Sequence, residues 1–147
     1  MNSTATFPSV SSAVGVPFDL DGAPALPTAL QRACLAAKTA ADNKAQNIVV
    51  LDLRTVTPVF DFFVISTAAS RRQVHTIVED SDAALRGVGD SRLSVEGYES
   101  SKWVVQDYGD VVVHVFDTET RDYYNLEELW ADAEKIDWEE ELEDPSE

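Results

Sequence analysis

The chain of 147 residues is 44% hydrophobic, which is enough for one ordinary domain with a buried core. Its 27 acidic and 11 basic residues give a formal charge of -16. This charge argues against non-specific binding to the nucleic-acid backbone, because such binding needs clusters of Lys and Arg. We therefore expect no direct sequence-specific nucleic-acid binding, and a basic protein surface as the partner.

The single cysteine, Cys34, cannot form an intrachain disulfide, which indicates a reducing compartment. No run approaches the roughly 20 apolar residues that span a bilayer. The N-terminus also has no basic start followed by an apolar run, so no secretory signal is evident. These features predict a cytoplasmic protein without a membrane partner.

Within residues 1–66 the chain changes from a polar extension to regular structure. Residues 1–26 are rich in Ser, Thr, Ala, Pro and Gly without sustained periodicity, which predicts a disordered N-terminal extension. Residues 28–45 are Ala-rich, with apolar side chains on one helical face, and this helix is expected to bury Cys34. Residues 48–53 and 62–66 are apolar runs that predict two strands.

The clearest helix begins at Ser70, which predicts a capping box with Gln73 three residues later. Apolar residues then recur at helical spacing until Gly87 and Gly89, which are expected to end the helix. Residues 92–95 predict a short third strand.

Residues 103–116 predict a β-hairpin. The turn Asp107-Tyr108-Gly109-Asp110 separates two strand-like runs, and Gly109 can take the positive φ of a tight turn. The second run, residues 111–116, is almost wholly β-branched and apolar, as expected of a strand covered on both faces. His114 inside it is therefore predicted to be a core residue and not a catalyst.

The last part of the chain predicts a helix followed by a tail. Residues 119–131 carry a helical apolar pattern through Tyr123, Leu126, Leu129 and Trp130. Residues 132–147 contain nine acidic residues and one Lys, which predicts a frayed or disordered acidic tail. The alternative for this tail is a short acidic-aromatic motif, with Trp138 and Leu142, that docks on a basic surface.

The order of these elements predicts one α/β domain over residues 27–131. Its core is a mixed five-stranded sheet with helices packed on it.

Six segments in register resemble the ribosomal silencing factor family, also called Iojap. They are Asp42-Asn43-Lys44-Ala45-Gln46-Asn47-Ile48-Val49-Val50-Leu51-Asp52-Leu53-Arg54, Asp61-Phe62-Phe63-Val64-Ile65, Ser70-Arg71-Arg72-Gln73-Val74, Val95-Glu96-Gly97, residues 103–116, and Tyr123-Tyr124-Asn125-Leu126-Glu127-Glu128-Leu129-Trp130. The resemblance covers nearly all of the predicted domain.

The resemblance implies a non-catalytic protein with a nucleotidyltransferase-like fold. Family members bind a small basic β-barrel protein on the intersubunit face of the large ribosomal subunit, uL-fourteen, and block joining of the small subunit. Translation then falls when nutrients are scarce, and organellar relatives aid assembly of the large subunit. The silencing role is the main prediction, and a role in large-subunit biogenesis is the alternative.

Two positions depart from the family pattern. The family commonly has Tyr where Phe62 stands, and Ser-Gly-Thr-Ser where this chain has Thr67-Ala68-Ala69-Ser70. Loss of that glycine makes the turn before the helix less permissive, which argues further against a nucleotide pocket there.

The predicted partner-binding residues lie on the hairpin and just before it. Trp103 either caps the core at a sheet edge or anchors a partner, and the family resemblance favours the anchor, since Trp and Tyr dominate interface hot spots. Strand alternation places Trp103, Val105 and Asp107 on one face of the strand. The full predicted set is Trp103, Val104, Val105, Asp107, Tyr108, Asp110, Glu96 and Tyr98.

Within this set the carboxylates are expected to meet a basic partner. Asp107 is predicted to form a charge-assisted contact, and Glu96 beside Tyr98 extends the acidic margin. Asp110 is equally well explained as a turn former.

An enzyme is the main rival, by analogy of fold with nucleotidyltransferases. Their metal-binding aspartate pair lies on a strand, whereas Asp80 and Asp82 are predicted inside a helix, where side chains two residues apart diverge. We therefore assign no catalytic, cofactor or metal residue. A second rival is a self-associating module, because the exposed hairpin edge can pair with another copy in a homodimer.

Overall fold

The computed structural model describes residues 25–143. Of the predicted disordered extension, only residues 25 and 26 fall in this range, so that prediction lies outside the described residues. In chain order the elements are α1 (Ala29–Asp42), β1 (Gln46–Asp52), β2 (Phe62–Ala68), α2 (Arg71–Gly87), β3 (Ser94–Glu96), β4 (Trp103–Asp107), β5 (Val111–Asp117), α3 (Thr118–Tyr124), α4 (Leu126–Leu129), β6 (Glu134–Ile136) and α5 (Trp138–Glu143).

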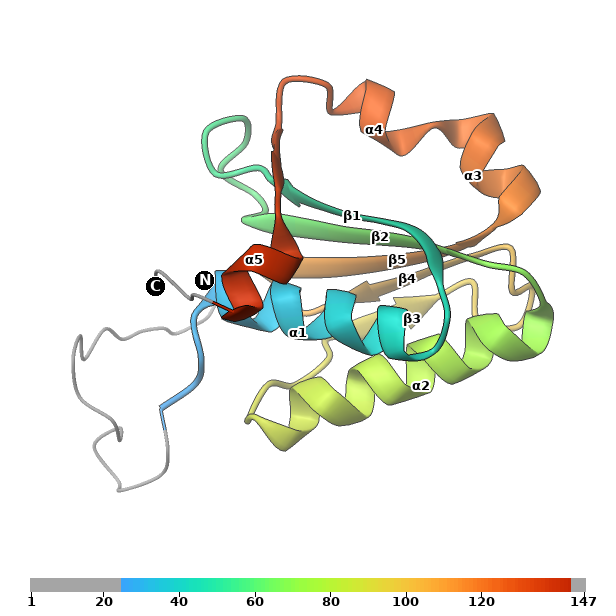
Figure 1. Cartoon of the computed structure of the whole chain (residues 1–147), viewed down its shortest axis with the longest axis horizontal. Coiled ribbons are helices and arrows are strands. Elements are labelled where there is room, and N and C mark those ends of the chain that lie inside the picture. Colours follow the sequence, from blue (N-terminus) through green and yellow to red (C-terminus); the bar gives the residue numbers. More distant parts are fainter. Residues whose placement is uncertain (1–24, 144–147) are drawn as a thin grey trace.

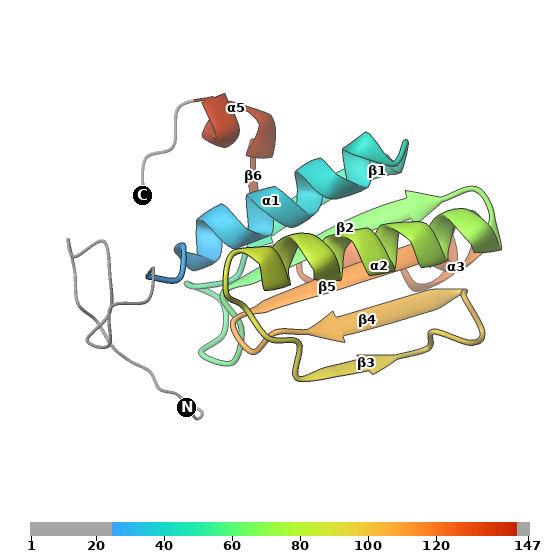
Figure 2. The same cartoon turned by 90° about the horizontal axis from the view of Figure 1, so that it is seen from below.

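The strands form one mixed sheet in the order β3-β4-β5-β2-β1-β6 (Figure 2). β2 and β5 lie side by side and run parallel, and the other neighbouring pairs are antiparallel. A parallel pair requires a crossover connection, and α2 with the β3–β4 hairpin provides it. The α/β class and the mixed sheet predicted from the sequence are confirmed.

The sheet has six strands and not the predicted five, because the acidic segment contributes one. β6 pairs with β1, where Ile136 lies opposite Val50. α5 then lies beside α1, and Ile136 and Trp138 pack against the core. The prediction of a frayed tail is therefore wrong for residues 134–143, because these two apolar side chains anchor the segment despite its carboxylates.

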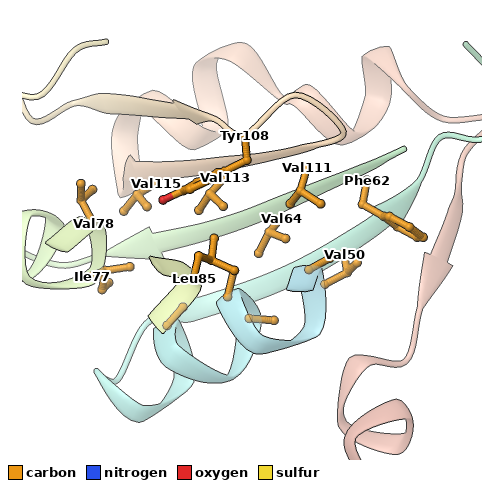
Figure 3. Packing of buried hydrophobic residues seen from close by; sticks show 14 of the residues in the cluster. Val50, Phe62, Val64, Ile77, Val78, Leu85, Tyr108, Val111, Val113 and Val115 are labelled. Carbon is orange, nitrogen blue, oxygen red and sulfur yellow. The ribbon is translucent and has the colours of Figure 1, made fainter. Parts of the chain in front are cut away.

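Helices α1 and α2 cover one face of the sheet (Figure 1). Figure 3 shows the valine side chains of the central strands pointing into this layer, toward Ile77, Val78 and Leu85 of α2. α1 adds small buried residues, among them Ala33 and Ala37, which allow its backbone to approach the sheet closely. Cys34 is buried there, as predicted.

The N-cap side chains of the two long helices each accept a backbone hydrogen bond from the first turn of the helix. Thr28 and Gln31 form a reciprocal capping box at α1. At α2, Ser70 accepts a hydrogen bond from the Gln73 backbone N–H at 3.1 Å, but the Gln73 side chain accepts from Ala69 N–H and not from Ser70. The capping box predicted at Ser70 is therefore only half formed.

Helices α3 and α4 lie over the opposite face of the sheet (Figure 1). They replace the single helix predicted over residues 119–131, because Asn125 adopts a left-handed conformation with φ 46° and breaks the pattern. Leu126 is buried against this face, whereas Tyr123 and Leu129 are exposed. The two short helices cover only part of the sheet face.

Candidate partner-binding surface

The strand β4 has two different sides. Trp103, Val105 and Asp107 are half-buried, whereas Val104, Gln106 and Tyr108 on the alternate positions are buried under α2. The predicted alternation is confirmed. We call the surface formed by Trp103, Val105, Asp107, Glu96, Tyr123 and Tyr124 the open face, because the helices leave these residues half-buried or exposed.

Trp103 is fixed at the centre of the open face. Its ring stacks on Phe116 with centroids 4.9 Å apart, and its Nε1 donates a hydrogen bond to His114 Nδ1 at 3.1 Å. The ring of Tyr124 approaches it at 4.8 Å. The indole is thus held in one position while part of its surface stays accessible, which is the arrangement of a rigid aromatic anchor.

The buried His114 supports this tryptophan and is a core residue, as predicted. Burial lowers its pKa to about 3, so the imidazole is neutral near pH 7. Because Nδ1 accepts from the indole, Nε2 carries the proton, and Nε2 has no hydrogen-bond partner among residues 25–143. His114 therefore holds the Trp103 indole in position.

Tyr123 and Tyr124 enlarge the aromatic part of the open face. Their side chains are 81% and 53% exposed, and their rings meet edge-to-face at 5.0 Å. The sequence pattern had placed Tyr123 on the buried side of a continuous helix, and this is wrong. The signal for the correct placement is Asn125, a residue that tolerates the left-handed conformation and ends α3 directly after the two tyrosines.

Two carboxylates flank the aromatic residues. Glu96 of β3 is exposed and pairs with Val105, so it shares the face of Trp103. Asp107 is half-buried, and its Oδ1 accepts a hydrogen bond from Gly109 N–H at 2.7 Å. No hydrogen bond to its second oxygen is found within the described residues.

The hairpin turn has the predicted geometry. Gly109 has φ 93°, and Tyr108 N–H donates to Val111 O at 2.9 Å. A second glycine, Gly97, has φ 82°, and a Cβ there would lie 2.1 Å from the Trp103 carbonyl oxygen. Only glycine fits where the β3–β4 connection passes the backbone of the anchor residue.

Two predicted contact residues are corrected because their side chains are buried. Val104 is fully buried, and Tyr108 is 5% exposed in the layer below α2 (Figure 3). The Tyr108 hydroxyl donates to Asp82 Oδ1 at 2.7 Å. Burial and this carboxylate raise the pKa of Tyr108 far above its usual value. Both residues support the core and are inaccessible to a partner.

Asp110 belongs to an ion cluster around a buried arginine, but its own side chain is 37% exposed, so its role in partner binding stays a prediction. Arg32 of α1 is 4% exposed and donates two hydrogen bonds to Asp110, at 2.6 and 2.9 Å, and one to Asp90 at 2.8 Å. Burial raises the pKa of Asp90 despite the guanidinium. The cluster joins α1, the α2–β3 loop and the hairpin turn.

Tyr98 lies on the α2 side and not on the open face. Its ring stacks on His75 of α2 with centroids 4.1 Å apart, and its hydroxyl donates to Glu79. The hydrogen bond to Glu79 raises the pKa of Tyr98. Tyr98 is therefore corrected to a residue that fastens the β3–β4 connection to α2.

The aspartates considered as metal ligands do not form a metal site in the described residues. Residues 25–143 contain no group of three or more His, Cys, Asp or Glu side chains placed to hold a metal ion. Asp80 and Asp82 point to different partners, Asn43 and Tyr108. No helix in the same range is long and apolar enough to cross a membrane.

Comparisons with known proteins agree on one family. A family model described as "Ribosomal silencing factor during starvation" matches residues 27–147. A ribosomal silencing factor of Halalkalibacterium halodurans is 40% identical over 105 residues, which are 71% of this chain and 90% of that protein. The chloroplast protein Iojap of Zea mays is 36% identical, over 69% of this chain and 44% of that protein.

Solved structures show the same fold. A crystal structure of a protein from Chromobacterium violaceum superimposes with a TM-score of 0.69 and 35% identity, and covers 71% of this chain and 88% of that one. A Bacillus halodurans structure gives a TM-score of 0.62 and 38% identity, over 70% and 93% of the respective chains.

Proposed function

Because the chain belongs to the ribosomal silencing factor family, we propose that it binds the large ribosomal subunit through the open face and blocks joining of the small subunit. Translation is repressed in this way when nutrients are scarce. The chain acts by occupying space, without catalysing a reaction.

The single observation that carries the proposal is that Trp103 is held in place by its neighbours but is only partly buried. The indole is fixed by Phe116, Tyr124 and His114, yet the residue is only half-buried. A preorganised aromatic loses little conformational freedom on binding, so more of its contact energy appears as affinity. The exposed Tyr123 and Tyr124 widen the apolar contact beside it.

The charge of the open face indicates the chemistry of its partner. Glu96, opposite Val105, and Asp107, at the end of the same strand as Trp103, are the acidic residues of the open face, and the whole chain carries a formal charge of -16. A basic protein surface complements both, and the small basic β-barrel protein of the intersubunit face is the partner that we propose.

Co-sedimentation with separated ribosomal subunits tests the proposal. We expect the chain to pellet with large subunits and to reduce their joining to small subunits. Trp103→Ala should weaken binding about thirtyfold or more, as hot-spot truncations do. Val59→Ala, at a 64% exposed apolar residue of the β1–β2 loop, is the matched control and should bind normally.

The outcomes separate the alternatives. Failure both to co-sediment and to inhibit joining would overturn the proposal. Co-sedimentation without any effect on joining would favour the role in large-subunit biogenesis. Binding to the purified basic β-barrel protein that is lost in Trp103→Ala would support the specific partner.

A further inference from the structure

A second surface lies at the other end of the sheet, four strands from β3 and three from β4. It is a groove of about 530 Å³ beside the N-terminal half of β1. Residues 47–49 form one wall, and Arg121, Asp122, Asn125 and Glu127 from the α3–α4 region form the other. The groove shares α3 with the open face, since Tyr123 and Tyr124 belong to the open face and Asp122 and Asn125 to the groove, but no residue lines both.

The strand edge in this groove is unpaired. β1 begins at Gln46, but β6 pairs only with Val50, Leu51 and Asp52. After Ile136 the chain leaves the sheet for α5, as Figure 1 shows. Within the described residues, no strand continues the track of β6 beside residues 46–49.

The direction of the backbone groups follows from the neighbouring ladder. Leu53 N–H donates to Asp61 O, toward the β2 side. Alternation along an antiparallel strand then directs the backbone groups of Val49 toward β2 and those of Ile48 away from it. The peptide groups of Ile48 are thus directed to the open edge.

The same span is irregular in its pairing with β2. Gln46 lies opposite Thr67 and Val49 opposite Ile65, so Asn47 and Ile48 oppose one residue. Asn47 adopts a left-handed conformation with φ 52° in this bulge, and Asn125 across the groove has φ 46°. Bulges and left-handed non-glycine residues are enriched beside binding sites.

The charge of the groove selects the occupant. The guanidinium of Arg121 is 6% exposed and already engaged by Thr67 at 2.7 Å and Glu127 at 2.6 Å. α3 and α4 otherwise carry only acidic charges, Glu119, Asp122, Glu127 and Glu128. The positive charge of Lys135 on β6 also favours the ionised form of Glu127. Because Glu127 is paired with Arg121, the exposed charges of α3 and α4 are those of Glu119, Asp122 and Glu128, all negative, and of these Asp122 lines the groove.

We propose that this groove binds an extended basic peptide, which adds to β1 as a strand beside residues 46–49. Its backbone pairs with Ile48, and Lys or Arg side chains at alternate positions face the carboxylates of α3 and α4. Strand addition of this kind takes affinity from main-chain hydrogen bonds and specificity from alternate side chains. The bound peptide continues the track of β6.

Titration with an alternating lysine–valine octapeptide tests this proposal. We expect hydrogen exchange at the Ile48 amide to slow on addition of millimolar peptide, and binding to weaken as salt rises. Asp122→Asn should reduce the affinity about two- to fivefold. Glu139→Gln, an exposed carboxylate on α5, is the matched control and should leave the affinity unchanged.

A glutamate–valine octapeptide is the ligand control and should not bind. Equal binding of both peptides, or no slowing of exchange at Ile48 with the lysine peptide, would overturn the proposal. Slowing of exchange at Ile48 with protein concentration alone would also overturn it, since a second copy of the chain would then occupy the edge. Trp103→Ala should bind the peptide normally, so failure here is distinguishable from failure of the open face.

Discussion

The two faces of the sheet differ in what covers them, although the same strand supplies both. On the side of α1 and α2, Val104 and Tyr108 are closed off from solvent by long helices. On the side of α3 and α4, Trp103 and Val105 of the same strand are only half-buried. Residue type therefore does not determine which side of this strand is buried, since adjacent valines have opposite surroundings.

The largest effect is expected when the ion cluster of Arg32, Asp90 and Asp110, on the side of the sheet covered by α1 and α2, is broken. Arg32→Met should destabilise the fold by about 3–5 kcal/mol, because Asp90 and Asp110 lose their shared buried cation. Chemical denaturation measures the free energy of unfolding. The matched control is Lys38→Met on the same helix, whose exposed pair with Asp42 should contribute less than about 1 kcal/mol.

This prediction also tests the independence of the two faces. Folded Arg32→Met protein should still co-sediment with large subunits, because Arg32 does not contact the open face. Loss of binding in protein that remains folded would mean that the cluster also sets the position of the hairpin turn.

The adjacent valines of β4 give a direct comparison of the faces. Val104→Ala should cost about 2 kcal/mol of unfolding free energy, since it leaves a cavity below α2, and should leave subunit binding intact. Val105→Ala should cost less than about 1 kcal/mol, because its site is half-open, and should weaken binding. Equal stability losses in the two variants would contradict the description of the faces.

The pH dependence of stability reports on the histidine under the open face. Because burial lowers the pKa of His114 to about 3, the folded state resists protonation that the unfolded chain accepts near pH 6.5. Stability from this residue is therefore present above about pH 6.5 and decreases as the pH falls toward 3. From pH 7 to pH 5 the loss should be about 2 kcal/mol.

His114→Gln is the control for this pH dependence, since its side-chain oxygen can still accept the Trp103 N–H. The variant should lose less stability than the natural chain over the same pH interval in thermal melts. An identical pH profile would show that other groups cause the dependence.

The smallest expected effect concerns the charges on the rim of the open face. Glu96→Gln should weaken binding to large subunits about two- to fivefold and flatten its salt dependence. Glu143→Gln, an exposed carboxylate of α5, should change neither. Binding that does not respond to salt in any of the variants would mean that the aromatic residues dominate the contact.

Local patterns in the sequence predicted a large part of the fold. The strands at β2 and β5, the helix after Ser70, the Gly109 turn and the burial of His114 follow from periodicity and turn chemistry, and they are confirmed. The family resemblance is confirmed by comparison, because several motifs occur in register. The alternation of buried and half-buried side chains along β4 also follows from the pleated geometry of a strand.

The errors have a common physical origin. Val104, Tyr108 and Tyr98 lie near Trp103 in the sequence, but their side chains pack against parts of the chain that are far away in the sequence. Tyr108 reaches Asp82. Long-range contacts of this kind depend on how the helices dock on the sheet.

By itself the sequence determined the class of fold, the hairpin, its two-sided strand and the family. These depend on local geometry, since side-chain period and turn conformation act over a few residues. Only the tertiary structure decided which face of β4 is closed, that the acidic segment supplies a sixth strand, and that Tyr123 and Tyr124 stand beside Trp103. The physical reason is that burial is a property of what packs on a residue, and here the covering elements come from distant parts of the chain.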